Sequence, residues 1–334
     1  MAEKMKRKLI SIATGCFNEA GNIRELYERI KAVFAAHPQY DWELVIADNH
    51  STDGTVGILE AIAAADRRVK VIFNARNFGH LRSPFNAVLN TSGDAVAIMV
   101  SDLQEPPEML HEFLARWEEG IPAVCGVRAA SGEAAPVSGL RKLYYRMLRC
   151  ASDDAEVIPD FTGFGLYDRK VIDAIRRFDE PYPYLRGLLS EVGFERVLVP
   201  FRQQKRKAGR TKNNLFTLYD CAMTGFVNHT TLPLRLATFS GFAIAGASLL
   251  IAAAYLVLKL IHWQNFSLGL APIMIGIFFL GAVQLIFIGI LGEYLGAVWR
   301  QVKHRPLVIE ERRLNFDDPP VPPAETEHPG EAEK

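Results

Sequence analysis

The chain has 334 residues, 49% of them hydrophobic, and its 38 lysines and arginines balance 38 aspartates and glutamates. This composition excludes a disordered or fibrous protein, and the lack of a basic excess argues against nucleic acid as the main partner. The four cysteines form no CxxC pair and have no histidine cluster beside them, so the sequence supports neither a disulfide framework nor a zinc site. A reducing, cytosolic setting is expected.

The first part of the chain alternates short apolar segments with amphipathic helical patterns. The apolar segments, which we predict to be strands, are residues 9–13, 42–47, 69–73, 95–100 and 123–127. After the first of them, six apolar side chains recur at helical spacing and are expected to form one buried face: Ile23, Leu26, Tyr27, Ile30, Val33 and Phe34. The alternation predicts an α/β fold, an open sheet covered by helices, whose ligands bind beyond the carboxyl ends of the strands.

Two segments near the C-terminus, residues 237–258 and 270–291, contain no charged residue. Each is 22 residues long, and a helix of that length extends about 33 Å, enough to cross a hydrocarbon core of about 30 Å. Because only residues 259–269 connect them, we predict a two-helix transmembrane hairpin. Its outer flanks contain the basic residues Arg235, Arg300, Lys303 and Arg305. The connection contains a single lysine, so the positive-inside rule places both flanks and the N-terminal domain in the cytoplasm.

Two amphipathic helices are predicted between the sheet and the hairpin. The first, around residues 140–149, either packs on the sheet or lies in the lipid interface. The second comes directly before the spans, and this position favours a location in the lipid interface. The segment after residue 316 is rich in proline and glutamate, which is typical of a disordered tail. The predicted units are a cytosolic domain (1–213), a juxtamembrane helix (214–232), the hairpin (233–299), a cytosolic segment (300–316) and the tail (317–334).

Polar motifs follow the first four predicted strands in order. They are Cys-Phe-Asn-Glu at residues 16–19, Asp-Asn-His-Ser-Thr-Asp-Gly-Thr at 48–55, Arg-Asn-Phe-Gly-His at 76–80 and Asp-Leu-Gln-Glu-Pro-Pro-Glu at 102–108. Together they resemble the successive signatures of family 2 glycosyltransferases, in the membrane branch of dolichyl-phosphate mannose synthases and bacterial polyprenyl-phosphate glucosyltransferases. The resemblance continues through Arg206, Gly209 and Lys212 into both spans. One motif alone is weak evidence, whereas the ordered set is specific.

The resemblance implies a nucleotide-diphospho-sugar transferase fold (GT-A), with a Rossmann-like open sheet. It also implies transfer of a sugar from a nucleotide-diphospho-sugar to a polyprenyl phosphate such as undecaprenyl phosphate, usually with inversion at the anomeric carbon. The expected cofactor is Mg²⁺ or Mn²⁺, and the expected location is the inner (plasma) membrane. Four glycines in the spans, Gly241, Gly246, Gly276 and Gly281, permit close helix packing and favour a homo-oligomer.

By resemblance, Asp102 is a catalytic residue and the metal ligand, with Gln104 as a neutral oxygen donor. A cation held there neutralises the charge of the departing nucleoside diphosphate. The alternative interpretation is a helix N-terminus, because residues 106–108 suit a first helical turn, and both can hold together. Family members commonly carry a second aspartate two positions before Asp102, where this chain has Val100, which weakens the metal assignment.

The resemblance also assigns the nucleotide-sugar site. Its predicted residues are Cys16, Asn18, Glu19, Asp48, Arg76, Asn77 and Asp102. Asn49 replaces the second acid of a paired acidic motif. From the residues alone, Asp48 can equally begin an Asx turn, and Asn18 with Glu19 can equally mark a helix N-terminus. A structural hydrogen bond is as good an interpretation of His80 as proton transfer.

The acceptor side requires positive charge rather than a general base, because a lipid phosphate is already anionic near neutral pH. Arg128, Arg202, Arg206 and Lys212 are predicted to bind the lipid phosphate, and Arg128, Arg206 and Lys212 are also predicted to act in catalysis. The alternative is a basic flank attracted to anionic lipid, and this interpretation is favoured for Lys205, Lys207 and Arg210. Relatives often carry an acid and an arginine where this chain has Gly163 and Gly165, and Asp160 can substitute for the acid.

The sequence is compatible with two alternative functions. Residues 203–207 faintly resemble the QxxRW signature of processive polysaccharide synthases, although the tryptophan is missing and two spans are few for a translocating pore. The substitutions at Val100, Asn49 and Gly163 are also compatible with a catalytically silent, membrane-bound nucleotide-sugar sensor or scaffold.

Overall fold

The computed structural model describes residues 7–129, 158, 161–178, 180, 183–204, 232–261, 270–303 and 305–317. Within this part of the chain, eight strands form one sheet in the order β7-β5-β6-β4-β1-β2-β3-β8. The strands are β1 (Lys8–Cys16), β2 (Tyr40–Asp48), β3 (Val69–Asn74), β4 (Ala95–Ile98), β5 (Ala123–Arg128), β6 (Phe161–Asp168), β7 (Arg196–Phe201) and β8 (Glu310–Leu314). The predicted α/β fold with an open sheet is confirmed, and the sheet is mixed.

Six of these strands point the same way. β1 pairs in parallel with β2 and β4, β2 with β3, and β5 with β7. β6 is antiparallel to both β4 and β5, so β5 and β7 run in the direction of β1 to β4, whereas β8 is antiparallel to β3. The carboxyl ends of β1 to β5 and β7 therefore share one edge, which we call the carboxyl edge. The strand order reverses between β4 and β1, and ligands of such sheets bind at this switch point.

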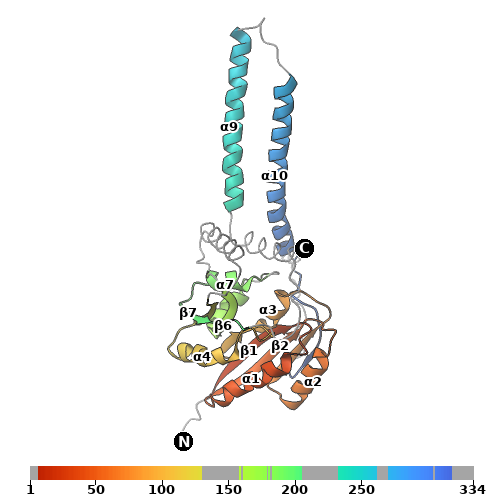
Figure 1. The fold of residues 1–334 in the computed structure, drawn as a ribbon, viewed down its shortest axis with the longest axis vertical. Coiled ribbons are helices and arrows are strands. Elements are labelled where there is room, and N and C mark those ends of the chain that lie inside the picture. The colour runs from red at the N-terminus through yellow and green to blue at the C-terminus, as the bar shows by residue number, and fades with distance from the viewer. Residues whose placement is uncertain are drawn as a thin grey trace, which may run out of the picture.

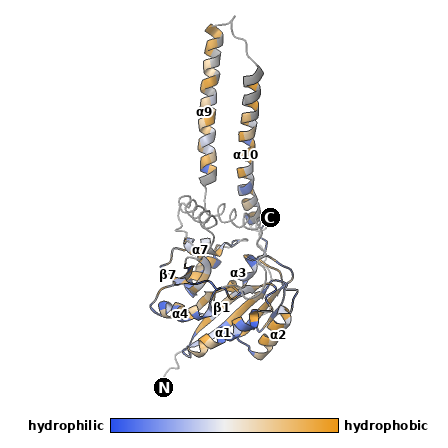
Figure 2. Cartoon of the chain, viewed as in Figure 1, coloured by the Kyte–Doolittle hydropathy of each residue, from blue (hydrophilic) through white to orange (hydrophobic). Residues whose placement is uncertain are grey.

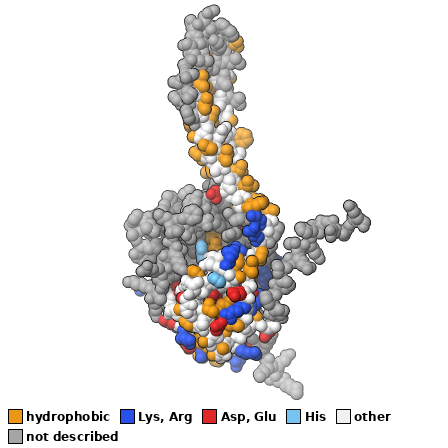
Figure 3. Space-filling view, turned by 90° about the vertical axis from the view of Figure 1, so that its right-hand side faces the viewer, with side chains coloured by type: hydrophobic (Ala, Val, Ile, Leu, Met, Phe, Trp, Pro, Cys, Tyr) orange, Lys and Arg blue, Asp and Glu red, His pale blue; other side chains and the backbone are white. Residues whose placement is uncertain are grey.

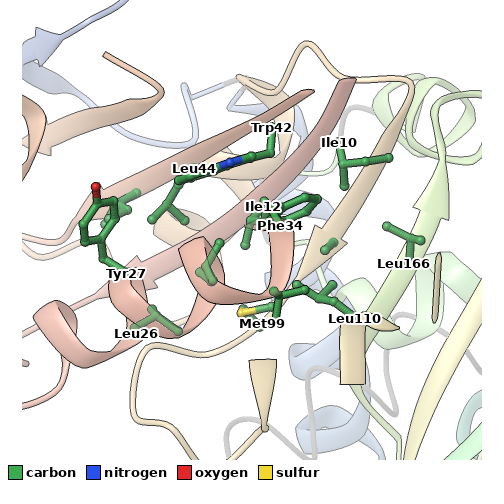
Figure 4. Close-up of a cluster of buried hydrophobic side chains, with 14 of the residues drawn as sticks. Ile10, Ile12, Leu26, Tyr27, Phe34, Trp42, Leu44, Met99, Leu110 and Leu166 are labelled. Atoms are coloured by element: carbon green, nitrogen blue, oxygen red, sulfur yellow. The ribbon is translucent and has the colours of Figure 1, made fainter. Parts of the chain in front are cut away.

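Helices cover both faces of the sheet (Figure 1). They are α1 (Ile23–Ala35), α2 (Thr55–Ala65), α3 (Arg82–Leu89), η1 (Pro107–Met109), α4 (Leu110–Glu118), α6 (Arg169–Arg176) and α7 (Leu185–Glu191). Side chains of α1, α2 and α4 share one hydrophobic cluster, part of which is shown in Figure 4, and those of α3, α6 and α7 share the other. The buried residues of α1 are the six predicted from periodicity, Ile23, Leu26, Tyr27, Ile30, Val33 and Phe34, which confirms that prediction.

Beyond the sheet, α9 (Leu232–Ile261) and α10 (Leu270–Val302) lie side by side and extend away from the domain (Figures 1 and 2). They include both predicted spans. Their apolar side chains are strongly exposed, with Phe242 at 73% and Leu285 at 71%. In the part of the chain that the structure describes, Phe279–Trp299 is long and apolar enough to cross a membrane. The two-span hairpin remains a prediction.

The chain returns to the domain after α10, where β8 becomes an edge strand beside β3. Asn315, which follows β8, donates hydrogen bonds to the carbonyl oxygens of Ala63 and Val69 at 2.7 and 2.8 Å. The predicted division, which separated residues 300–316 from the domain, misses this strand. The strand sequence Glu-Glu-Arg-Arg-Leu lacks the apolar alternation of a half-buried strand, and charged residues are common on edge strands.

Three predicted segments fall outside the described residues. They are the amphipathic helix at residues 140–149, the juxtamembrane helix at 214–232 apart from its last residue, and the tail at 317–334 apart from its first.

Candidate active site

Cys16 and Asp48 end β1 and β2 and are partners in the parallel register. The Cys16 thiol donates a hydrogen bond to Oδ1 of Asp48 at 3.5 Å, and the backbone N–H of Ser51 donates to Oδ2 at 3.0 Å. Burial, followed by the charge of Asp48, raises the pKa of Cys16 well above its ordinary value of 9.0. The thiol is therefore protonated near neutral pH. The buried Asp48 carboxylate holds the turn after β2, as the turn interpretation predicts.

Hydrogen bonds join the loops that follow β1 and β2. The backbone N–H of Asn18 donates to Oγ of Ser51 at 2.9 Å, and the N–H of Thr52 donates to Oδ1 of Asn18 at 2.7 Å. The backbone N–H of Glu19 donates to Oγ1 of Thr55 at 2.9 Å. Asn18 and Glu19, both predicted nucleotide-sugar residues, therefore lie at the carboxyl edge in the turn that leads into α1.

Asn49 connects the loop after β2 to the loop after β3. Its Nδ2 donates to Oδ1 of Asn77 at 2.9 Å and to the carbonyl of Gly79 at 3.1 Å, while its Oδ1 accepts the N–H of Phe78 at 2.8 Å. An aspartate cannot make the two donated bonds, which explains the amide at this position. Arg76 is exposed and lies over the Phe78 ring at 4.1 Å, so both Arg76 and Asn77 belong to the carboxyl edge.

The loop that contains Asp102 begins two residues earlier than predicted, because β4 ends at Ile98. Asp102 is 8% exposed, and its Oδ1 accepts the backbone N–H of Gln104 at 3.1 Å. Between them, Leu103 has a φ of 60° and a buried side chain. η1 begins at Pro107 with Glu108 in its first turn, as the alternative interpretation of this segment predicts.

Oxygen donors are present here for a hard divalent cation. Asp102 offers a carboxylate and Gln104 a partly exposed carboxamide, and Mg²⁺ or Mn²⁺ commonly completes its coordination with phosphate oxygens and water. The donor set therefore fits such a cation bound together with a diphosphate. Among the described residues, no group of three or more His, Cys, Asp or Glu side chains could hold a metal by itself.

Glu105 is a buried acid of this loop and is not among the predicted site residues. Its carboxylate accepts a hydrogen bond from the Thr162 hydroxyl of β6 at 2.6 Å and another from the backbone N–H of Val100 at 3.0 Å. Burial raises the pKa of Glu105, the hydrogen bonds from Thr162 and Val100 and the charge of Arg128 oppose the rise, and the charge of Asp102 adds to it. The sequence offers one indication of its importance: Glu105 lies in the Asp102 motif, directly before two prolines.

The two basic residues at the ends of β5 and β7 reach the same edge. Arg128 is the last residue of β5, and Arg202 follows β7 with an exposed side chain. The backbone N–H of Gln204 donates to the carbonyl of Gln104 at 3.0 Å, which ties the segment after β7 to the Asp102 loop. The other two predicted basic residues, Arg206 and Lys212, lie outside the described residues.

Comparisons with known proteins identify the family. Residues 11–176 match the model of glycosyl transferase family 2. The uncharacterized glycosyltransferase YkcC of Bacillus subtilis is 33% identical over 92% of this chain and 95% of its own length. This chain belongs to glycosyltransferase family 2. The bactoprenol glucosyl transferase of Shigella phage SfV is 30% identical over 90% of this glycosyltransferase and 97% of its own length.

One solved structure that resembles the glycosyltransferase is the mannosyltransferase PcManGT from Pyrobaculum calidifontis in complex with GDP-Man and Mn²⁺. It is 15% identical, with a TM-score of 0.45 and coverage of 90% of this chain and 88% of that chain.

Gly163 and Gly165 of the glycosyltransferase are required by the local structure. Gly163 has a φ of 95°, a conformation that residues with a side chain rarely adopt. A Cβ on Gly165 would lie 2.2 Å from the carbonyl oxygen of Val124 in the neighbouring strand. The acid and the arginine of the family pattern therefore cannot occupy positions 163 and 165 unless the backbone shifts. Asp160, the predicted substitute, lies outside the described residues.

Backbone strain also concentrates at this edge. Among the described residues of the glycosyltransferase, four that are not glycine have a positive φ, and three of them, Asn18, His50 and Leu103, belong to the loops after β1, β2 and β4. Such conformations cost about 1–3 kcal/mol each and persist where the surrounding contacts enforce them. Their location supports the carboxyl edge as the functional site.

Proposed function

We propose that this enzyme transfers a sugar from a nucleotide-diphospho-sugar to a polyprenyl phosphate at the cytoplasmic face of the inner membrane, with inversion at the anomeric carbon. The observation that carries the proposal is the likeness to a bactoprenol glucosyl transferase over 97% of that protein's length, which includes the region of the long apolar helices. Held in the membrane by those helices, the enzyme would lie where a lipid-linked acceptor is found.

The donor binds at the carboxyl edge in this proposal. Asn18, Glu19 and Asp48 line the part of the site that binds the nucleoside. Hydrogen bonds within and between the loops after β1 and β2 hold this part of the site in shape before the donor binds, which lowers the conformational entropy lost on binding. Asp102 and Gln104 hold Mg²⁺ or Mn²⁺ against the diphosphate. The bound cation supplies positive charge opposite the departing nucleoside diphosphate.

The acceptor phosphate approaches from the side of β5 and β7. Arg128 and Arg202 are placed there, and guanidinium groups bind phosphate oxygens through two parallel hydrogen bonds. Arg206 and Lys212 complete this basic set in the proposal. The lipid phosphate oxygen attacks the anomeric carbon directly, so no residue needs to remove a proton.

Both long helices span the membrane in this proposal. Figure 3 shows hydrophobic side chains along the helices and basic side chains where they meet the domain. At the lower end of α10, the Lys303 ammonium lies 4.3 Å from the centre of the Trp299 ring, and both side chains are exposed. Tryptophan and lysine are frequent at the cytoplasmic interface of membrane helices, which supports this orientation.

The test is a transfer assay on membranes that contain the full chain. Labelled UDP-, GDP- and dTDP-sugars are incubated with undecaprenyl phosphate, with and without EDTA, and the lipid extract is analysed. One donor is expected to give a lipid-linked monosaccharide, and chelation is expected to stop the reaction. Elongated products would instead indicate a processive synthase, and tight donor binding without any release of nucleoside diphosphate would indicate a sensor.

A further inference from the structure

Three separate contacts hold the Asp102 loop in place. Oγ of Ser101 donates to the carbonyl of Gly15 at 3.0 Å, which ties the start of the loop to β1. The carbonyl of Gln104 accepts the N–H of Gln204 from the segment after β7. The third contact is the Glu105 carboxylate, which reaches both back across the loop and over to β6.

The Glu105 carboxylate closes the loop on itself. One oxygen accepts the N–H of Val100 at the start of the loop, and the other accepts the Thr162 hydroxyl, 57 residues later in the chain. Thr162 Oγ1 in turn accepts the N–H of Phe164 at 3.3 Å, which leaves its hydrogen directed at Glu105. Only 3% of Glu105 is exposed, so water does not compete for these bonds.

The loop between these fixed ends is strained. Leu103, with its φ of 60°, separates Asp102 from Gln104. A leucine keeps this conformation only when its surroundings enforce it. If the closure at Glu105 is released, the loop can relax, and the oxygens of Asp102 and Gln104 move relative to each other.

We infer that Glu105 is a positioning residue whose bridge from Val100 to Thr162 sets the spacing of Asp102 and Gln104 for the cation and diphosphate. This inference rests on the proposed function, because it assigns Glu105 to the same site. Side chains that orient metal ligands typically contribute 10- to 100-fold to metal affinity or activity. Glu105 itself does not touch the donor.

The test measures Mn²⁺ binding to the detergent-solubilised full chain by electron paramagnetic resonance, alone and together with UDP, GDP or dTDP. Thr162→Val keeps the shape of the side chain and removes the hydroxyl, while Thr162→Ser keeps the hydroxyl. We expect Thr162→Val and Glu105→Gln to weaken Mn²⁺ binding by about 10- to 100-fold and Thr162→Ser to bind like the wild type. The KM for the sugar donor should rise in step, and the KM for undecaprenyl phosphate should stay unchanged.

Two controls separate positioning from stability. Glu108→Gln changes an acid of the same motif that instead forms an ion pair with Arg29 on α1 at 2.5 Å, and it should leave Mn²⁺ binding unchanged. Thermal unfolding of each variant shows whether the fold is kept. Wild-type Mn²⁺ affinity in both Thr162→Val and Glu105→Gln would overturn the inference, as would losses that Thr162→Ser shares.

Asp102→Asn separates this inference from the proposed function. If Asp102→Asn loses Mn²⁺ while Glu105→Gln and Thr162→Val keep it, the metal assignment stands and the positioning role alone fails. If Asp102→Asn binds Mn²⁺ like the wild type, or if the wild type does not bind it, the metal assignment fails and the positioning role fails with it.

Discussion

A glutamate is buried at each end of the central sheet, in opposite electrostatic settings. Towards the amino ends of the strands, Glu43 of β2 accepts hydrogen bonds from the Ser11 hydroxyl at 2.5 Å and the N–H of Ser92 at 2.7 Å, and it pairs with the Lys70 ammonium at 2.8 Å. At the carboxyl edge, Glu105 has two hydrogen-bond donors but also lies near the like charge of Asp102.

The pKa directions express this difference. Burial acts to raise the pKa of Glu43, but the bonds from Lys70, Ser11 and Ser92 outweigh it, so the pKa is lowered. For Glu105, burial outweighs the bonds from Thr162 and Val100 and the charge of Arg128, the charge of Asp102 adds to the effect of burial, and the pKa is raised. The amino half thus compensates its charge within the protein and contributes stability. At the carboxyl edge, the hydrogen bonds to Glu105 do not fully offset the cost of burying its charge near Asp102. Such incomplete compensation is typical of sites that bind ligands.

The largest expected effect is on activity, at the carboxyl edge. Asp102→Asn keeps an oxygen that can accept the N–H of Gln104 but removes the negative charge. We expect transfer to fall about 1,000-fold, equivalent to about 4 kcal/mol of transition-state stabilisation, with an unchanged melting temperature. Initial rates of lipid-linked sugar formation measure this. Near-normal rates would remove the metal role from Asp102.

The matching change in the amino half should affect stability instead. Lys70→Met leaves the buried Glu43 carboxylate without its ammonium partner, and we expect a loss of about 3 kcal/mol in the free energy of unfolding. Urea unfolding of the detergent-solubilised chain measures the loss. Activity per folded molecule should be unchanged, and a specific loss of catalysis would mean that the two halves are not functionally separate.

A smaller effect is expected where the loops after β2 and β3 meet. Asn49→Asp restores the acid of the family pattern, but it replaces two donated hydrogen bonds with contacts between acceptors at Asn77 and Gly79. We expect about 2 kcal/mol of destabilisation and a higher KM for the sugar donor. Donor kinetics and thermal unfolding measure the two effects. A variant that binds the donor more tightly would contradict this account of Asn49.

The smallest expected effect is a change in the pH dependence of stability. Because the folded pKa of Glu43 lies below its ordinary value of 4.5, its ionised form stabilises the fold above that pH. This contribution is lost as the pH falls through the lower, folded pKa. Glu43→Gln should therefore be less stable than the wild type above pH 4.5, and the difference should shrink on acidification. Melting temperatures across this range test the sign.

Local patterns predicted much of the domain. The apolar side chains of α1 are buried as their spacing requires, and the motifs after the first four strands lie together at the carboxyl edge. Prediction succeeds here because helical periodicity reports burial within a few residues, and because parallel strands bring their carboxyl ends to one edge. The ends of strands were less predictable, as the early end of β4 at Ile98 shows.

The sequence by itself determined the α/β class, the four polar loops and the long apolar helices, since each of these depends on a pattern among residues that are close together in the chain. Only the tertiary structure decided the partners of groups that are far apart in the chain. Glu105 finds Thr162 across 57 positions, and the charged strand β8 joins β3 after the chain has passed through both long helices. No local pattern encodes such pairings, because the packing of the whole sheet selects them.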